Sequence, residues 1–434
     1  MELLMQYVWQ LGVFGRGKVT AVDGRCVEVI DRGTLNTGPG PDFFNAKVRV
    51  DGQLWAGNVE LHVRASDWFR HGHQSDRAYG NVVLHVVAVD DAEVCIDGRD
   101  EPVPQIVMGD VRRYQEFYDR LLNRDMPTLG CAPELRHLTS IEVAEWLACL
   151  GYARLQRKAD GIADMVDHLR GDWSETSYII LARGLGFGTN ADAMERVARA
   201  MPLRLLGRHS DSLRLVEAML LGQAGLLEPQ ACGLDDGQYA DDYHRYLLDQ
   251  YRFFRTKFSL DGPLAPGWRT GGLRPGNSPW RRVAMLAQYV CLGLAGGSRL
   301  MEVTDLDTML GVLDVELGEY WQKHWRPGAE APYTHRLSMS SRRLLLVNVV
   351  IPLIYARAEH TGRYDLTAAY ADMLQQLEPE DNRIIRLFAQ TGLPACDALE
   401  SQALIELYNE YCARRRCVSC RFAHRLLARR IAAP

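Results

Sequence analysis

The sequence predicts an α+β protein, with a strand-rich domain over residues 1–110 and a mainly α-helical domain over residues 111–434. In the first quarter of the chain, hydrophobic and polar residues alternate with the period of two that is typical of β-strands. Asp-Gly pairs, which favour tight hairpin turns, separate these runs. After about residue 111 the apolar residues recur at i, i+3 and i+4, as they do in amphipathic helices.

The N-terminal domain is predicted to begin with one helix, because MELLMQYVWQL at residues 1–11 has helical spacing. Two short strands follow in KVTAVDG and CVEVIDRG, around an Asp-Gly turn. A second hairpin pairs FNAKVRV with QLWAGNVELHV and turns at Asp51 and Gly52. Runs rich in β-branched residues predict further strands at 81–91, 92–98 and 102–108.

The helical domain is predicted from apolar spacing between capping residues. The expected helices lie within 111–124, 140–170, 175–185, 191–206, 211–227, 241–258, 280–294, 342–360, 365–377 and 398–416. A stretch rich in Gly and Pro, SLDGPLAPGWRTGGLRPGNSP, interrupts them at residues 259–279. A loop this long inside a compact domain is usually functional or connects domains.

Composition limits the functional classes that the sequence allows. The chain of 434 residues has 47% hydrophobic and 24% charged residues, as an ordinary soluble protein does. Its net charge of -5 gives no global sign of nucleic-acid binding. Because no run reaches about 18 uninterrupted apolar residues, we expect no membrane span. The ten cysteines are mostly single and inside apolar runs, which favours reduced thiols and a cytoplasmic location.

Two acidic residues in neighbouring predicted strands suggest a metal site. Asp42 lies just before one strand and Glu60 lies inside the next. Alternation in NVELHVR places Glu60, His62 and Arg64 on the same face of the sheet. Magnesium prefers one or two carboxylates together with water and substrate phosphate. The sequence therefore predicts that Asp42 and Glu60 bind Mg²⁺ or Mn²⁺.

This order of elements, with GPGPDF before one strand and VELHV in the next, resembles the PD-(D/E)XK, or restriction-endonuclease-like, superfamily. The resemblance implies that Asp42 and Glu60 are metal ligands, that the Leu61 carbonyl is a third ligand, and that the fold is restriction-endonuclease-like. It also implies a metal-dependent phosphodiesterase that acts on nucleic acid, with Asp42, Glu60 and His62 as its catalytic residues. His62 stands where the superfamily has lysine, so it serves as a base or phosphate contact, or the site has decayed. The alternative is a non-catalytic nucleic-acid-binding or scaffold protein that retains a nuclease-like core.

A cluster of histidines and aspartates follows directly in DWFRHGHQSDRAYGNVVLH. His71 and His73 form a His-x-His pattern near Asp76, which could bind zinc or iron. We favour a second interpretation, in which these three residues form a substrate-binding lip beside the acid pair. Asp76 could also cap a turn.

A cationic loop at the start of a predicted helix is a second candidate for substrate binding. Arg274, Arg281 and Arg282 lie in LRPGNSPWRR, where a helix N-terminus could hold an anion. The same arginines could instead dock the helical domain on the sheet domain.

The C-terminal segment 396–430 is rich in Cys and Arg and offers a possible second metal site. Cys412, Cys417 and Cys420 have C-x4-C-x2-C spacing, and Cys396 lies upstream. This spacing resembles that of plant-type ferredoxins, so an iron–sulfur cluster is one possible occupant. Zinc with Cys396 or His424 as the fourth ligand is another. The thiols could equally pack a C-terminal helix.

Several motifs together resemble an uncharacterised bacterial family, numbered 2851 among domains of unknown function. The motifs are GPDFFNA, GNVELH, SDW, LHVV, LGFGTN, EAMLLGQAG, RPGNSPWRR and LYNEYC with the cysteines that follow it. The resemblance implies a cytoplasmic bacterial protein and brings no established activity. It leaves the oligomeric state open.

Overall fold

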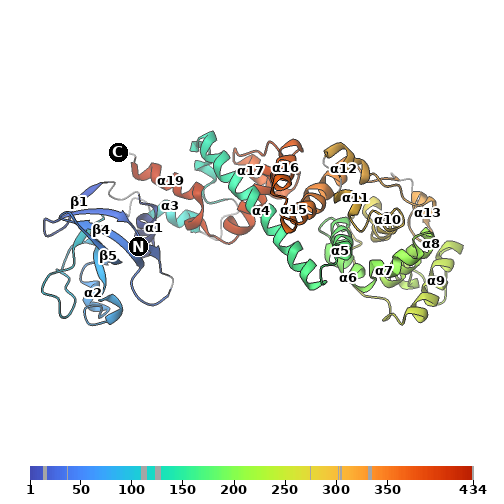
Figure 1. The fold of residues 1–434 in the computed structure, drawn as a ribbon, viewed down its shortest axis with the longest axis horizontal. Helices are drawn as coiled ribbons and strands as arrows, with labels where there is room; N and C mark the ends of the chain where they lie inside the picture. The colour runs from blue at the N-terminus through green and yellow to red at the C-terminus, as the bar shows by residue number, and fades with distance from the viewer. Residues whose placement is uncertain are drawn as a thin grey trace. The chain divides into compact units, whose positions relative to one another are not determined.

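The chain forms two compact units in the computed structural model, which describes residues 1–12, 17–36, 38–108, 115–122, 129–273, 275–301, 303, 305–330 and 335–432 (Figure 1). The N-terminal unit comprises residues 1–147, 382–394 and 404–434, and the helical unit comprises residues 148–381 and 395–403. Helices account for 55% of the residues, and all strands of the large sheet lie in the N-terminal unit, which confirms the predicted α+β class. The units divide at other positions than the expected border at residue 110, because the C-terminal segments belong to the N-terminal unit.

The N-terminal unit is built on a seven-stranded mixed sheet with the order β1-β2-β4-β5-β6-β7, in which β3 pairs with β4. The pairs β1–β2, β2–β4, β3–β4 and β4–β5 are antiparallel, whereas β5–β6 and β6–β7 are parallel. The strands are β1 (Lys18–Thr20), β2 (Cys26–Asp31), β3 (Thr34–Leu35), β4 (Phe43–Val50), β5 (Gln53–Arg64), β6 (Val82–Val89) and β7 (Gln105–Val107). Helix α1 (Glu2–Leu11) packs against β5.

The hairpin between β4 and β5 follows directly from its turn residues. Asp51 and Gly52 both have positive φ angles, 48° and 89°, as a two-residue hairpin turn of the primed type requires. Val50 therefore pairs with Gln53, and the two strands run side by side back to Phe43 and Val59. The parallel pair β5–β6 needs a crossover, which residues 65–81 supply with α2 (Asp67–Arg70) and η1 (Arg77–Tyr79).

Residues 92–98 are not a strand, so that part of the prediction was wrong. Val94 and Ile96 alternate with exposed neighbours, but they pack with Trp68 in a small apolar cluster. The recorded backbone bond of this run to a later segment is from Val103 N–H to the Val94 carbonyl, at 2.9 Å. Burial of alternate side chains produced the strand pattern here without a hydrogen-bonded ladder.

The remaining helices of the N-terminal unit come from both ends of the chain. They are α3 (Gln115–Leu122), η3 (Ala132–His137), the start of α4 (Ser140–His168), α17 (Arg383–Gln390), the end of α18 (Ala398–Glu406), η9 (Leu407–Cys412), η10 (Cys417–Ser419) and α19 (Arg421–Ala432). Helix α19 packs against η3 and η10. The sequence reading missed α17, although Asn382 caps it through bonds from Ile384 N–H and Ile385 N–H.

The helical unit packs around one large apolar core. Besides the rest of α4 and the start of α18, its elements are α5 (Trp173–Leu185), α6 (Ala191–Ala200), α7 (Leu203–Leu206), η4 (Gly207–His209), α8 (Leu213–Gln223), η5 (Pro229–Cys232), α9 (Asp242–Phe258), η6 (Pro275–Asn277), α10 (Pro279–Cys291), α11 (Ser298–Met301), α12 (Leu306–Val312), α13 (Glu319–Lys323), β8 (His324–Arg326), β9 (Ala329–Glu330), α14 (Met339–Leu345), η7 (Leu346–Val350), α15 (Ile351–His360), α16 (Tyr364–Met373) and η8 (Leu374–Gln376). The predicted helices of this unit are therefore confirmed, with short additions between them.

In its described residues, 259–273 and 275–279, the Gly- and Pro-rich stretch is irregular, as predicted, except for η6 and the first residue of α10. Its backbone is nevertheless held. Trp268 Nε1–H donates to the Ala224 carbonyl at 2.9 Å, and Arg269 N–H donates to Asn190 Oδ1 at 2.9 Å. The stretch is thus a fixed loop on the helical unit.

One helical segment of the described chain, Met339–His360, is long and apolar enough by composition to cross a membrane. Its 22 residues include a window with a mean hydropathy of 1.3, of which 56% is buried inside the protein. Leu346, Val350 and Ile351 from this segment belong to the core of the helical unit. A buried core helix has the same length and composition.

Candidate metal centre

The structure brings Asp42 and Glu60 into direct contact. Asp42 lies just before β4 and Glu60 lies in β5, and the antiparallel pairing of Phe43 with Val59 sets the two side by side. Asp42 N–H donates to Glu60 Oε2 at 3.0 Å, and Leu61 N–H donates to Asp42 Oδ2 at 2.9 Å. Gln6 from α1 donates to the other oxygen, Asp42 Oδ1, at 2.7 Å.

Burial disfavours negative charge on both carboxylates. Glu60 is 5% exposed, and burial raises its pKa, with a further increase from the charge of Asp42. Burial also raises the pKa of Asp42, although the hydrogen bond from Leu61 N–H opposes the increase. A cation placed beside Glu60 would offset this repulsion and favour the ionised form.

Two histidines lie beside the other oxygen of Glu60, and a third lies next to one of them. His62 Nε2 lies 3.6 Å and His73 Nε2 lies 3.5 Å from Glu60 Oε1. His71 Nδ1 lies 3.3 Å from His62 Nε2. One nitrogen from each of these three imidazoles lies within 4.8 Å of the other two. His62 comes from β5, whereas His71 and His73 come from the crossover that follows it.

A chain of hydrogen bonds behind His62 fixes which of its nitrogens faces Glu60. Gln105 Nε2 donates to Asp90 Oδ1 at 2.7 Å, which turns its Oε1 toward His85 Nδ1 at 2.8 Å. His85 Nδ1 therefore carries the proton, and His85 Nε2 accepts from His62 Nδ1 at 2.9 Å. His62 Nε2 then has a lone pair directed at the cluster, as in metal sites where an outer residue orients the histidine ligand.

The buried imidazoles of His62, His73 and His85 are held in the neutral form that binds metals. Burial, together with the neighbouring histidines, lowers the pKa of His62 to about 3. Burial is also the main cause that lowers the pKa of His73 and of His85, each to about 4. At neutral pH these rings therefore offer lone pairs rather than positive charge.

The donor spacing fits one transition-metal ion. Metal–nitrogen bonds of 2.0–2.1 Å in a tetrahedron separate the donors by about 3.3–3.4 Å, and three of the six separations among Glu60 Oε1, His62, His71 and His73 are 3.3, 3.5 and 3.6 Å. Imidazole nitrogen suits zinc, iron, copper or nickel better than magnesium. Both oxygens of Asp42 already accept N–H donors. Binding of Mg²⁺ between Asp42 and Glu60 stays a prediction, and the donor set favours a different ion centred on Glu60.

The remaining residues of the predicted histidine and aspartate lip have separate places. Asp76 is exposed and caps η1, where its Oδ1 accepts from Ala78 N–H at 2.9 Å, so the capping alternative describes it well. His73 is buried and stacks on Tyr79 with ring centres 3.7 Å apart. His71 is exposed and is the member of the histidine cluster that solvent reaches most easily.

The predicted arginine site belongs to the helical unit. Arg281 and Arg282 are both buried and line a cavity of about 100 Å³ with Asn277, Arg336 and Ser338. Arg281 donates to the Trp321 carbonyl at 2.8 Å, and Arg282 lies 4.5 Å from the centre of the Phe187 ring. Arg274 lies outside the described residues. The role of these arginines in substrate binding stays a prediction.

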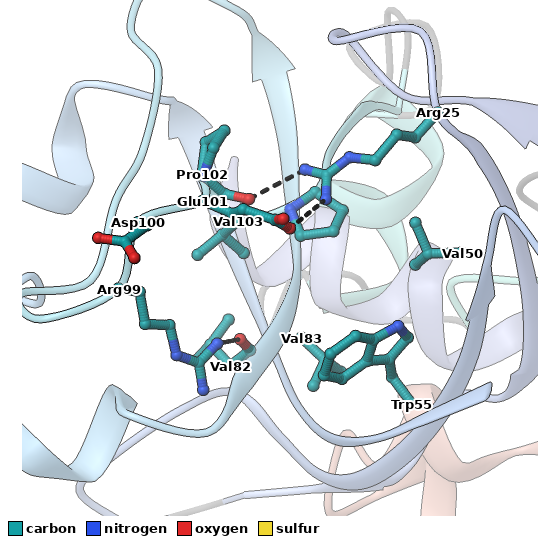
Figure 2. A pocket seen from close by; sticks show the side chains of 11 residues that line it. Arg25, Val50, Trp55, Val82, Val83, Arg99, Asp100, Glu101, Pro102 and Val103 are labelled. Atoms are coloured by element: carbon teal, nitrogen blue, oxygen red, sulfur yellow. Dashed lines mark hydrogen bonds and ion pairs between the residues drawn. The ribbon is translucent and has the colours of Figure 1, made fainter. Parts of the chain in front are cut away.

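A further cavity of about 460 Å³ opens on the sheet and contains none of the predicted site residues. Figure 2 shows Trp55 and Val83 on its wall and the side chains of Arg25 and Arg99 at its edge. The two guanidinium groups donate to the carbonyls of Pro102 and Val82. Its lining also includes Asp100 and Glu101, so the cavity gives no excess of positive charge for a phosphate backbone.

A fourth cysteine, Cys131, lies near the C-terminal cysteines, although the predicted metal site did not include it. Cys131 directly precedes η3 and lies near Cys412, Cys417 and Cys420, because the charges of Cys417 and Cys420 act on Cys131 and the charges of all three act on Cys412. Cys396 belongs to the helical unit, is exposed, and has Glu400 as its main electrostatic neighbour. Cys396 therefore has no described contact that supports a role as the fourth ligand.

Three polar residues that support the Glu60 site were not predicted to belong to it. His85 and Gln105 lie in the apolar runs of β6 and β7, and Gln6 lies on the apolar helix α1. Their positions were a usable sequence signal, because a single polar side chain inside an apolar run needs a buried hydrogen-bond partner.

The comparisons with known proteins identify a family and no described relative. Neither the curated proteins nor the solved structures include a significant match to the chain. Residues 2–383 match the family described as "Protein of unknown function (DUF2851)". This match includes the Glu60 site and Cys131 and ends before Cys412, so the part of the resemblance carried by LYNEYC stays a prediction. Because the match spans most of its length, the chain belongs to the DUF2851 family.

Proposed function

We propose that the N-terminal unit is a metal-dependent phosphodiesterase that acts on nucleic acid. Glu60, His62, His71 and His73 would hold its metal, and Asp42 would support Glu60. The observation that carries the proposal is that His62 and His73 each place a nitrogen within 3.6 Å of Glu60 Oε1, while one nitrogen of each of His62, His71 and His73 lies within 4.8 Å of the other two. A buried acid whose neighbours are buried imidazoles is typical of a functional site.

The strand directions support the restriction-endonuclease-like part of the proposal. Helix α1 is followed by β2, β4 and β5, which pair antiparallel, and then by a crossover to β6, which is parallel to β5. Asp42 stands before the second of these core strands and Glu60 stands in the third. The resemblance places its two acids at these same positions. Nucleic acid as the substrate rests on that resemblance alone.

Each residue of the site would have a distinct task. Asp42 fixes Glu60 through its backbone N–H, while Gln6 and Leu61 hold the Asp42 carboxylate in place. His62 is 1% exposed, so its burial favours a role as ligand over contact with a phosphate that arrives from solvent. A bound divalent ion would polarise the phosphodiester and lower the pKa of an attacking water. His71, the exposed member, marks the side from which substrate would enter.

A specific observation favours one alternative, a non-catalytic protein with a structural metal. Four protein donors complete a tetrahedron, and structural zinc sites are closed in this way, whereas catalytic sites keep a position open for water or substrate. The alternative predicts metal binding without cleavage. The two functions differ in whether the ion accepts a fifth ligand.

Cleavage assays with the full chain test the proposal. Labelled single-stranded DNA, duplex DNA and RNA would be incubated with the metal-stripped protein after addition of Mn²⁺, Zn²⁺ or Mg²⁺. We expect cleavage that requires added metal, is lost in Glu60→Gln and Asp42→Asn, and persists in Glu217→Gln, a buried carboxylate of the other unit. Cleavage that is unchanged in Glu60→Gln would contradict the proposal. Metal binding that depends on Glu60, without cleavage of any substrate, would instead establish the structural alternative.

A further inference from the structure

Two distant parts of the chain meet at the end of α3. The loop before Cys131 packs closely there, since a Cβ atom added to Gly130 would lie 3.0 Å from the Leu121 Cα and 2.5 Å from the Arg120 carbonyl oxygen. From the other part, Cys417 Sγ lies 3.3 Å from the Leu121 carbonyl oxygen. Cys131 and Cys417 therefore approach the same residue although they are separated by most of the chain.

The local backbone brings the other two thiols to this point. Arg415 has a positive φ of 53°, and the tight turn around it closes with Arg416 N–H bonded to the Tyr411 carbonyl at 2.8 Å. This turn joins Cys412 to Cys417, and Cys420 N–H then bonds to the Cys417 carbonyl at 3.0 Å. Cys131 directly precedes η3 and Cys420 directly precedes α19, and these two helices pack on each other.

The buried hydroxyl of Tyr7 has no hydrogen-bond partner among the described residues, which indicates a binding site for a further group beside the thiols. Tyr7 is 2% exposed. Its ring packs on Tyr118 and on His424, with both ring centres 5.7 Å away. Cys420, Cys417 and Cys131 all lie close enough for their charges to raise the pKa of this tyrosine. A buried hydroxyl normally finds a partner, so the site is polar and incomplete as it stands.

The four thiols lie in one packed region of the N-terminal unit. Cys131 precedes η3, Cys412 ends η9, Cys417 begins η10 and Cys420 precedes α19, and α19 packs against η3 and η10 while η9 packs against η10. None of the four is in a disulfide. Thiols gathered in this way repel one another as thiolates unless a cation binds among them.

We propose that Cys131, Cys412, Cys417 and Cys420 bind an iron–sulfur cluster. Four cysteine thiolates are the usual ligands of [2Fe–2S] and [4Fe–4S] clusters. A single zinc ion would need the sulfurs about 3.8 Å apart, given Zn–S bonds near 2.3 Å. Within the described part of the chain, no three of these sulfurs lie within 4.8 Å of one another. The wider spacing suits a cluster, in which the thiolates bind different iron atoms.

Binding would release the four thiol protons and tie the C-terminal helix to the rest of the N-terminal unit. The cluster would join the loop before η3 to the start of α19, with Tyr7 of α1 beside it. This centre is independent of the proposed phosphodiesterase, because it shares no residue with the Glu60 site. Either proposal can therefore fail while the other stands.

Metal analysis of the full chain, purified without oxygen, tests the assignment. We expect about four iron atoms and about four acid-labile sulfides per chain for a [4Fe–4S] cluster, or about two of each for [2Fe–2S], with an absorbance band near 400 nm. Cys131→Ser should lose at least half of the iron. Cys396→Ser, an exposed cysteine of the helical unit, should keep all of it and serves as the matched control.

The comparison of these two variants decides between the ligand sets. Equal iron content in Cys131→Ser and the wild type would overturn the assignment, as would one zinc per chain without iron. If Cys131→Ser fails to fold by circular dichroism, electron paramagnetic resonance of the reduced wild type provides the decision. No cluster signal after anaerobic reconstitution with iron and sulfide would then reject the proposal.

Discussion

Each unit of the protein buries a glutamate, and the two glutamates have different surroundings. Glu60 of the N-terminal unit lies beside two imidazole nitrogens and accepts a hydrogen bond from Asp42 N–H. Glu217 of the helical unit lies in α8, is 0% exposed, and accepts a hydrogen bond from the Tyr243 hydroxyl. Burial raises the pKa of both, for Glu217 to about 7.

The comparison teaches that a shifted pKa alone does not mark a functional site. Around Glu217 the neighbours in α8 are Val216, Ala218, Met219 and Leu220, all members of the apolar core. The Tyr243 hydroxyl donates to one oxygen of the acid there, and these apolar neighbours offer no further ligand for an ion. Around Glu60 the neighbours are themselves metal donors. The difference lies in the chemistry of the contacts and not in the depth of burial.

The largest expected effect is a loss of metal affinity when Glu60 is replaced, with no such loss when Glu217 is replaced. Glu60→Gln should reduce the affinity for Zn²⁺ or Mn²⁺ by at least about 100-fold, because it removes a ligand and the charge that pairs with the ion. Glu217→Gln should leave the affinity unchanged. Isothermal titration of the metal-stripped full chain measures both. Equal losses in the two variants would show that the effect comes from general destabilisation.

The buried Glu217 of the helical unit should make the free energy of unfolding depend on pH. The pKa of Glu217 is raised to about 7 from its ordinary 4.5, so its contribution to stability is full below pH 4.5 and is lost as pH rises through 7. The free energy of unfolding of the wild type, minus that of Glu217→Gln, should fall by about 3 kcal/mol between pH 4.5 and 8.5. Urea denaturation followed by circular dichroism at several pH values measures this difference. A constant difference would contradict the expectation.

A weaker effect should follow from loosening the support behind His62. Gln105→Leu removes the acceptor that fixes the tautomer of His85 and, through it, that of His62. Affinity for the metal should fall about 10-fold, as is usual when an outer hydrogen-bond partner of a ligand is lost. The matched control is Gln223→Leu, which removes a buried glutamine bonded to Tyr251 in the helical unit. Metal affinity that also fell in this control would deny Gln105 a specific role.

The smallest effect concerns Asp76, which the structure uses as a cap. Asp76→Ala should cost about 1 kcal/mol of stability, because Ala78 N–H loses its acceptor. Metal affinity should stay within twofold of the wild type, in contrast to the loss in Glu60→Gln. A large loss of metal binding in Asp76→Ala would place this residue among the ligands after all.

Local sequence signals predicted what depends on near neighbours. The hairpin of β4 and β5 follows from one Asp-Gly turn, which fixes the register from Val50 back to Ala46. The contact between Asp42 and Glu60 depends in addition on a register shift between Ala46 and Phe43, where Asn45 has a positive φ of 58°. Apolar periodicity predicted most helices but missed α17, whose cap Asn382 was a readable signal. Periodicity also produced a false strand at residues 92–98, where alternate burial occurs without pairing.

Long-range partners could not be predicted in the same way. His85 and Gln105 reach His62 only because β6 and β7 run parallel to β5, and the sequence does not state which strands are adjacent. Cys131 is an isolated cysteine, and only the packing of η3 against α19 brings it to Cys420. In both cases the chemistry was visible in the residue types, whereas the partner depended on tertiary structure.

The position of the four cysteines along the chain has a consequence for biosynthesis. Glu60, the histidines and Gln105 all leave the ribosome early, so a metal can reach them while the rest of the polypeptide is still being made. Cys131 emerges soon afterwards, yet Cys412, Cys417 and Cys420 are translated last, roughly 15–60 seconds later at 5–20 residues per second. During that interval Cys131 is part of a nascent chain that lacks the three other thiols of the proposed site.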